Sequence, residues 1–290
     1  MTANCYISQV QDPYLNLGIE DWLFRHVLAD EPLLLLWQNT PCVVIGRAQN
    51  PWLECNVPEL QAQNIPIVRR QSGGGTVYHD LDNLNISFLM PRAIYQPDQH
   101  IELVQAALTD LGIPTTASQR RDLFINHQSN LYKILGSAFR ETRSHAFHHM
   151  SLLIDANVEQ LWQALTPAIT AEHSKGVASV RREVMTLKMA APHITLPDVK
   201  HALQQRFAQC YGTEPTHIYI DAQTIPTHAA HYAETIAQWD WIFGKTLPFS
   251  FIYKSDVRCE VEKGVLIHPP ATEKPCLTQR IATQFSLRTT

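Results

Sequence analysis

Residues 69–80 of the chain read RRQSGGGTVYHD, which places three consecutive glycines between two short strand-like runs. Because glycine has no Cβ, such a loop can turn with positive φ and bring bare N–H groups close to an anion. Arg69 and Arg70 supply positive charge, and an arginine can hold a carboxylate or a phosphate through two parallel hydrogen bonds. The segment therefore predicts an anion-binding loop, with a flexible hairpin and a solvated arginine pair as the alternative interpretation.

Short apolar runs bounded by Pro, Asn or Gly surround this loop, as is typical of buried strands. They are residues 33–37, 42–45, 65–68, 76–78 and 85–90. Two longer segments have helical periodicity, residues 98–112 with Asp98 as the expected N-cap and residues 195–211 with Thr195 and Asp198 as a capping box. Because the strands follow one another without regular helices between them, we predict an α+β fold, a mixed β-sheet flanked by helices.

The composition is that of an ordinary globular protein, with 290 residues, 45% of them hydrophobic, and a formal net charge of −4. This acidic balance argues against a broad basic surface, so we expect neither nucleic acid nor a membrane as a partner. No apolar run approaches the roughly 18 residues of a membrane span, and the first residues lack the pattern of a signal peptide. Six cysteines without a C-x-x-C pair indicate a reducing compartment, and we expect a cytoplasmic protein.

The composition changes near residues 245–248, where a tryptophan-rich helical segment gives way to alternating runs at 249–253 and 257–261. This change predicts a large domain over residues 1–245 and a short accessory segment over residues 246–290. The second is smaller than the roughly 50 residues of the smallest usual domains.

A second motif, NLYKILGSAFR, occupies residues 130–140. Lys133 stands there among apolar neighbours and before small residues, a setting in which a lysine can be partly desolvated and aimed at a ligand. A surface lysine on an edge strand is the alternative. Further on, a strand would place His148 and His149 on opposite faces, and no carboxylate stands beside them at metal-ligand spacing. Dinucleotide-binding, zinc-protease, serine-hydrolase and glycosidase motifs are absent from the sequence.

Taken together, the motifs resemble the lipoate-protein ligase A family. The stretches that carry the resemblance are residues 13–17, 46–52, 69–83, 133–140 with His148-His149, and 175–181. The resemblance implies the fold shared by biotin and lipoate ligases, with residues 1–245 as the catalytic domain. It also implies a reaction in which lipoate and ATP give lipoyl-AMP and pyrophosphate, after which the lipoyl group passes to a lysine of a lipoyl domain. The expected partners are lipoyl domains of 2-oxoacid dehydrogenase acyltransferase subunits and the glycine cleavage H protein, and the expected state is a monomer.

The resemblance also implies roles for individual residues, with Lys133 as the catalytic residue that bridges the acyl carbonyl and the α-phosphate. The ATP- or adenylate-binding residues would be Arg70, Gly73, Gly74, Gly75, Thr76, Val77, Tyr78, Asp122 and Lys133. The lipoate-binding residues would be Arg70, Ser72, His79, Asn83, Lys133, Ser137, Ala138 and His149. ATP implies Mg²⁺, for which Asp122 is the candidate ligand. Trp37, Val44 and Val77 are candidate walls for the acyl tail, and core packing would explain them equally well.

Three features depart from the family pattern and keep alternatives open. Asp82 stands where glycine is usual, Arg121 where asparagine is usual, and the accessory segment is short. Asp82 and the short accessory segment would suit a transferase that uses preformed lipoyl-AMP, and a non-catalytic binder of lipoyl domains is a further alternative. An octanoyl or lipoyl transferase with a cysteine thioester is disfavoured because no cysteine lies between Cys55 and Cys210. The preferred acyl chain and the general base of the transfer step are left open.

Overall fold

The computed structural model describes residues 4–212, 216–253, 257–268, 285 and 287–289. They form two compact units, each built from three separate stretches of chain. Unit 1 comprises Met1–Thr40, His79–Val158 and Arg181–Ala233, and unit 2 comprises Pro41–Tyr78, Glu159–Val180 and Glu234–Thr290. The functional division at residue 245 stays a prediction.

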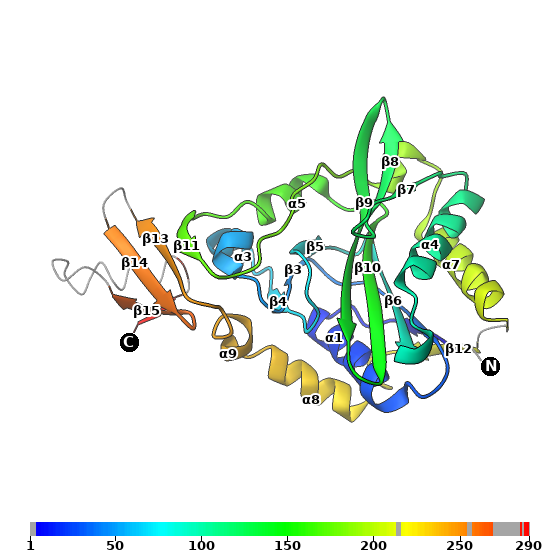
Figure 1. Ribbon diagram of the computed structural model, residues 1–290, viewed down its shortest axis with the longest axis horizontal. Coiled ribbons are helices and arrows are strands. Elements are labelled where there is room, and N and C mark those ends of the chain that lie inside the picture. Colours follow the sequence, from blue (N-terminus) through cyan, green and yellow to red (C-terminus); the bar gives the residue numbers. More distant parts are fainter. Residues whose placement is uncertain (1–3, 213–215, 254–256, 269–284, 286, 290) are drawn as a thin grey trace. The chain divides into compact units, whose positions relative to one another are not determined.

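Unit 1 is built on an eight-stranded sheet in the order β12-β1-β2-β6-β10-β9-β8-β7. The strands are β1 Asn4–Ser8, β2 Leu33–Trp37, β6 Asn83–Pro91, β7 Thr116–Ala117, β8 Leu123–His127, β9 Asn130–Glu141, β10 His145–Leu153 and β12 Thr216–Ile220. β1 pairs in parallel with β2 and β12, whereas the other neighbours are antiparallel. The predicted mixed sheet is thus confirmed, and the β8–β9 hairpin extends past the end of β10 (Figure 1).

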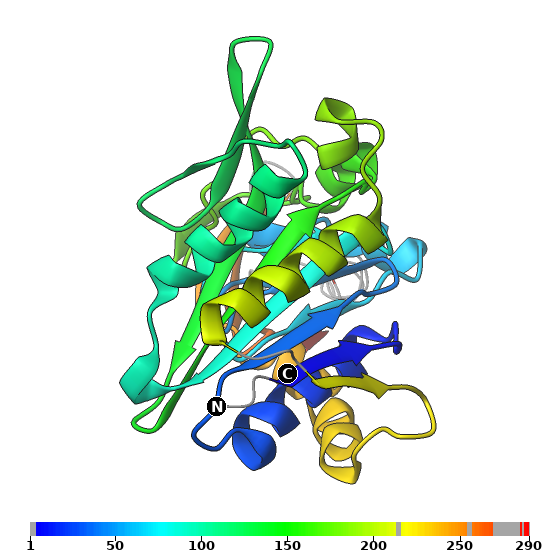
Figure 2. The ribbon, with the colours of Figure 1, turned by 90° about the vertical axis from the view of Figure 1, so that its right-hand side faces the viewer.

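Two long helices cover one face of this sheet, α4 (Pro97–Asp110) and α7 (Leu196–Tyr211), which lie side by side across it (Figure 2). Their apolar faces close a core with β6 and β10, in which Phe88 and Phe207 are fully buried with ring centroids 6.1 Å apart. The remaining helical segments of this unit are α1 Pro13–Trp22, η1 Leu23–Val27, η2 Arg92–Ile94, α6 Leu187–Ala190 and the start of α8 Thr227–Ile236. The helix-covered face of the sheet thus carries the main apolar core of unit 1.

The helix ends test two capping predictions. The capping box of Thr195 and Asp198 at the start of α7 is confirmed. Asp98 as N-cap of α4 is wrong, because Pro97 opens the helix with Gln96 before it and Asp98 lies in the first turn. Proline fits the first helical position because its missing N–H would have no partner there.

Unit 2 contains a three-stranded sheet in the order β4-β3-β5 and a five-stranded sheet in the order β11-β13-β14-β15-β16. The strands are β3 Cys42–Ile45, β4 Ile67–Arg69, β5 Val77–His79, β11 Ala171–Ser174, β13 Phe249–Tyr253, β14 Val257–Glu262, β15 Val265–His268 and β16 Arg288–Thr289. The helices are α2 Pro51–Glu54, α3 Val57–Ala62, α5 Val158–Ala164 and α9 Trp239–Ile242. Each apolar run predicted as a strand between residues 33 and 90 is found as a strand. The runs 33–37 and 42–45 match β2 and β3 residue for residue, whereas the ends of β4, β5 and β6 differ from the predicted ends by one or two residues. In the described part of the chain, no helix has the length and apolar character needed to cross a membrane.

Two buried histidines lie in the core of unit 1, His100 on α4 and His148 on β10. The His100 ring stacks on Phe88 at 4.6 Å and lies 5.6 Å from the His148 ring. Among the described residues, neither ring nitrogen of His100 has a hydrogen-bond partner. Burial lowers the pKa of His100 to about 3, and burial together with the neighbouring His100 holds the pKa of His148 well below its usual range.

This core predicts a pH-dependent stability. Because the folded-state pKa of His100 lies below the unfolded value of about 6.5, the unfolded chain binds the proton first. The stabilisation that comes from keeping the histidine neutral is therefore fully present above about pH 6.5. As the pH drops toward 3, the free energy of unfolding falls by about 1.4 kcal/mol per pH unit for each such histidine. When the pH is lowered from 7 to 5, the free energy of unfolding should fall by about 2 kcal/mol less in His100→Phe than in wild type. Urea unfolding at the two pH values measures this, and an equal loss in both proteins would contradict it.

Candidate functional site

The pairing of β9 with β10 sorts the predicted residues of unit 1 onto two faces of the sheet. His148 pairs with Phe139 and His149 with Ala138, so the two histidines point to opposite faces, as predicted. His148 Nε2 lies 3.0 Å from Ser137 Oγ on the helix-covered face. Ala138 and His149 share the other face. Ser137 and Ala138, both predicted to line a lipoate pocket, therefore present their side chains to different sides.

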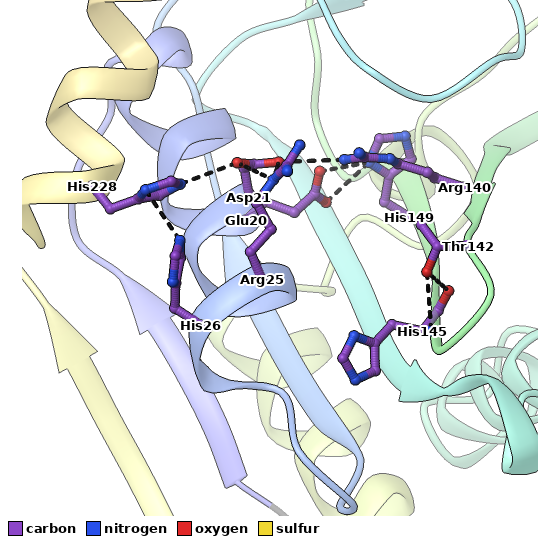
Figure 3. A network of polar contacts seen from close by, with 9 residues as sticks. All are labelled: Glu20, Asp21, Arg25, His26, Arg140, Thr142, His145, His149 and His228. Atoms are coloured by element: carbon purple, nitrogen blue, oxygen red, sulfur yellow. Dashed lines mark hydrogen bonds and ion pairs between the residues drawn. The ribbon is translucent and has the colours of Figure 1, made fainter.

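On the Ala138 face, a buried carboxylate holds His149 (Figure 3). Glu20 of α1 is 4% exposed, and its Oε1 lies 3.0 Å from His149 Nδ1 and accepts a hydrogen bond of 2.6 Å from Ser87 Oγ. Trp37 Nε1 in turn donates to Ser87 Oγ at 3.0 Å. A buried carboxylate needs such partners, because removing it from water without them is costly. The network fixes the position of His149.

Asp21, the next residue of α1, joins a second set of groups in the same view (Figure 3). It accepts from Arg25 at 2.8 Å and from Arg140 at 3.3 Å, and its Oδ2 lies 3.3 Å from His228 Nε2. Glu20 and Asp21 were missed in the sequence. The available signal was two consecutive acidic residues in a helix that is otherwise largely apolar.

Lys133 of β9 is held by Asp122, with Nζ 2.9 Å from Oδ1. The two side chains are 24% and 16% exposed, so the ion pair is partly shielded from water. Asp122 Oδ1 also accepts from the Ser137 N–H at 3.4 Å. The Lys133 backbone is fixed as well, since its N–H donates to the Glu183 carbonyl at 2.9 Å and its carbonyl accepts from Met185. Lys133 is therefore an anchored cation with a defined partner.

Asp122, the predicted magnesium ligand, has no further acidic or metal-binding groups gathered around it in the described residues. The Asp122 oxygen nearest Lys133 already serves the ammonium and the Ser137 N–H. In the described ranges, no group of three or more His, Cys, Asp or Glu side chains could hold a metal ion. Asp122 as a magnesium ligand stays a prediction.

The other predicted residues of unit 1 are buried in polar contacts. Asn83 is fully buried, donates to Asn85 Oδ1 at 3.3 Å and accepts from Ser151 Oγ at 2.8 Å. His79 is 3% exposed, with Nδ1 at 3.1 Å from Asn39 Nδ2 and its ring 6.2 Å from that of Trp37.

In unit 2, Arg69 has a structural role. It is 1% exposed, and its guanidinium donates to the carbonyls of Gly46, Arg47, Gln49, Trp241 and Ile242 and to Thr246 Oγ1, at 2.6–3.3 Å. Burial lowers the pKa of Arg69 to about 10. The prediction that Arg69 supplies charge for an anion is therefore wrong, because backbone carbonyls already surround the cation.

Arg70 shapes the glycine loop from within. Its Nε donates to Ser72 Oγ at 2.9 Å, Nη1 to the Val44 carbonyl at 3.0 Å, and Nη2 to the carbonyls of Gly73 and Gly75 at 2.6 and 2.7 Å. Of the three loop glycines, Gly74 takes a positive φ, 84°. The carbonyls of Gly73 and Gly75 therefore point toward the Arg70 guanidinium.

The end of the glycine loop is clasped by a distant segment of the same unit. Ser179 Oγ accepts from the Thr76 N–H and from Gln49 Nε2, both at 2.9 Å, and Thr76 Oγ1 donates to Gln49 Oε1 at 2.8 Å. The Ser179 N–H donates to Glu54 Oε1 at 3.1 Å, and its hydroxyl donates to Oε2. Val77 is half-buried and Tyr78 buried beyond this point. Gln49, Glu54 and Ser179 were missed, because their meeting depends on contacts between residues more than 100 positions apart.

Comparison with known proteins gives a consistent result. Residues 12–208 match the family model of the lipoyl protein ligase A/B catalytic domain. LipL1 of P. falciparum, solved in complex with lipoate, is 26% identical with a TM-score of 0.73, over 92% of this chain and 83% of that chain.

Two more distant structures share the fold. A bi-partite lipoate protein ligase of Thermoplasma acidophilum, described with its E2 lipoyl domain, is 18% identical with a TM-score of 0.69, over 85% of this chain and 98% of that one. A lipoate-protein ligase A bound with ATP is 19% identical with a TM-score of 0.66, over 83% of this chain and 96% of that one.

The buried position of Arg69 predicts that its removal destabilises the protein. In Arg69→Gln, carbonyls that now accept from the guanidinium lose their donor, which should lower the free energy of unfolding by more than about 2 kcal/mol. The matched control is Arg182→Gln, an exposed arginine whose loss should change stability by less than about 0.5 kcal/mol. Equal urea midpoints for the two variants would contradict this role.

Proposed function

Because the chain belongs to the family of the lipoyl protein ligase A/B catalytic domain, we propose that it activates lipoate with ATP and transfers the lipoyl group to a lipoyl domain. The observation that supports this proposal best is the ion pair of Lys133 with Asp122, on the strand that also presents Ala138 opposite His149. It places a fixed ammonium on the same strand as the proposed acyl-binding residues.

In the first step, a carboxylate oxygen of lipoate attacks the α-phosphorus of ATP, and the bond to pyrophosphate breaks. Two anions approach each other, so cations and N–H donors must offset the charge that grows in the transition state. Lys133 is the catalytic residue of this proposal, with its ammonium on the acyl and α-phosphate oxygens. Magnesium brought in with ATP, as part of the substrate, would neutralise the negative charge of the departing pyrophosphate.

In the second step, the amine of an acceptor lysine attacks the acyl carbonyl, an amide bond forms and AMP leaves. The attacking amine must first lose a proton, because the reference pKa of lysine is about 10.4. The acceptor we propose is a lysine of a lipoyl domain. For the lipoyl group we propose the face with Ala138 and His149, and for the nucleotide the loop from Gly73 to Tyr78.

The two departures from the family pattern take different forms in the structure. Asp82 does not have a positive φ, and the neighbours Asp80 and Asp155 help burial to raise its pKa. Arg121 has a φ of 64°, a conformation that asparagine adopts more readily than arginine. Its guanidinium is paired with Asp98, with Nε 2.6 Å from Oδ1, and thus has a partner of its own.

Lipoate-dependent exchange between ATP and pyrophosphate tests the proposed activity. Wild type should exchange with lipoate, and octanoate and biotin define the acyl preference. In Lys133→Ala, the exchange rate should fall by about 10²–10³, the usual effect of removing one transition-state charge contact. Lys188→Ala is the control, since Lys188 forms an exposed pair with Asp155 and should keep the wild-type rate.

The results of these assays distinguish a ligase from a transferase and from a non-catalytic binder. Transfer from supplied lipoyl-AMP without any exchange would identify a transferase and overturn the adenylation step. Tight binding of a lipoyl domain with neither activity would identify a non-catalytic binder. Wild-type exchange in Lys133→Ala would remove Lys133 from the mechanism.

A further inference from the structure

A one-residue irregularity in β9 decides where Lys133 points. β8 and β9 pair antiparallel, but Leu123 pairs with Leu135 and Phe124 with Lys133, so Ile134 is an extra residue in β9. An extra residue reverses the faces that the preceding side chains take. Ile134 and Leu135 are both fully buried in the apolar core under the helices, and Lys133 is moved to the opposite face.

Gly136 lies on that opposite face, two residues before Ala138 and paired with Ser151 of β10. A Cβ added at Gly136 would lie 3.3 Å from both Cε and Nζ of Lys133 and 4.0 Å from Asp122 Oδ1. The end of the lysine therefore occupies the space that a side chain at position 136 would take. Gly136 does not have a positive φ, so its backbone conformation does not require glycine.

We propose that Gly136 is a positioning residue for the reaction, because its missing side chain is the space in which the Lys133 ammonium rests against Asp122. This inference rests on the proposed function to the extent that Lys133 is the catalytic residue. It goes beyond the role of Lys133, because it requires that position 136 carries no side chain.

A side chain at position 136 should displace the end of Lys133 and leave the fold unchanged. A Cβ at 3.3 Å is a tight contact, and the atoms that it meets are the flexible end of a side chain. The lysine end can move away while the backbone of β9 stays in place. Misplacing a reacting group by about 1 Å can cost up to about 10² in rate.

The test compares Gly136→Ala and Gly136→Val with wild type in lipoate-dependent exchange and in transfer from lipoyl-AMP. We expect kcat of Gly136→Ala to fall by about 10- to 100-fold, KM for lipoate to change little, and the melting temperature not to fall. Gly136→Val should lose more activity. The control is Leu131→Ala, an exposed residue of the same strand that should keep wild-type kinetics. Wild-type kcat in Gly136→Ala, or a loss of activity explained by a lower melting temperature, would overturn the proposal.

A second measurement does not depend on activity. Brief acylation with an N-hydroxysuccinimide ester, followed by peptide mass mapping, reports how strongly Lys133 is held, with exposed Lys263 as the internal reference. The rate at Lys133 relative to Lys263 should rise several-fold in Gly136→Ala and similarly in Asp122→Asn, because both changes release the ammonium. An unchanged ratio in Gly136→Ala would overturn the proposal. If wild type shows neither exchange nor transfer, the proposed function fails, while these ratios still decide whether Gly136 holds Lys133.

Discussion

The alternation of side chains along β10 is the constraint on which unit 1 depends. Ala146, His148, Met150 and Leu152 point into the core under α4 and α7, and the residues between them point to the other face. A slip of one residue would exchange the two faces, burying His149 in the apolar core and removing it from Glu20. The contacts of Glu20 with Ser87 and His149 therefore oppose any other register, because a buried carboxylate without partners would be costly.

One extra residue in β9, Ile134, places Lys133 on a different face of the sheet from Ile134 and Leu135. Ile134 and Leu135 both face the core, and Lys133 faces the side of Asp122, Gly136 and Ala138. Bulges commonly redirect a side chain next to a functional site. The positive charge of Lys133 is thus kept out of the apolar core.

The two adjacent arginines of unit 2 both donate to oxygen atoms of their own unit, and the binding of ATP or lipoate by Arg70 stays a prediction. Arg69 is surrounded by carbonyls, and Arg70 donates to Ser72 and to the carbonyls of Val44, Gly73 and Gly75. Both arginines contribute to the shape of the loop. In our proposal the loop N–H groups and the Lys133 ammonium then supply the affinity for a phosphate.

The sequence predicted the local features well and the long-range ones poorly. The strands around the glycine loop, the capping box of Thr195 and the opposite faces of His148 and His149 follow from periodicity and spacing over a few residues. The partners of Arg69 and Glu20 lie far away in the chain, and the extra residue Ile134 depends on pairing with β8. No local sequence pattern predicts such long-range contacts.

In our proposal, lipoate binds on the face of the sheet that carries Ala138 and not on the face under the helices. Methyl NMR of the wild-type protein during titration with lipoate distinguishes binding on these two faces. We expect the Ala138 methyl signal to shift, while the methyl signals of Met150 and Leu152 on the other face stay in place. An unmoved Ala138 signal at saturating lipoate, or shifts confined to Met150 and Leu152, would contradict it.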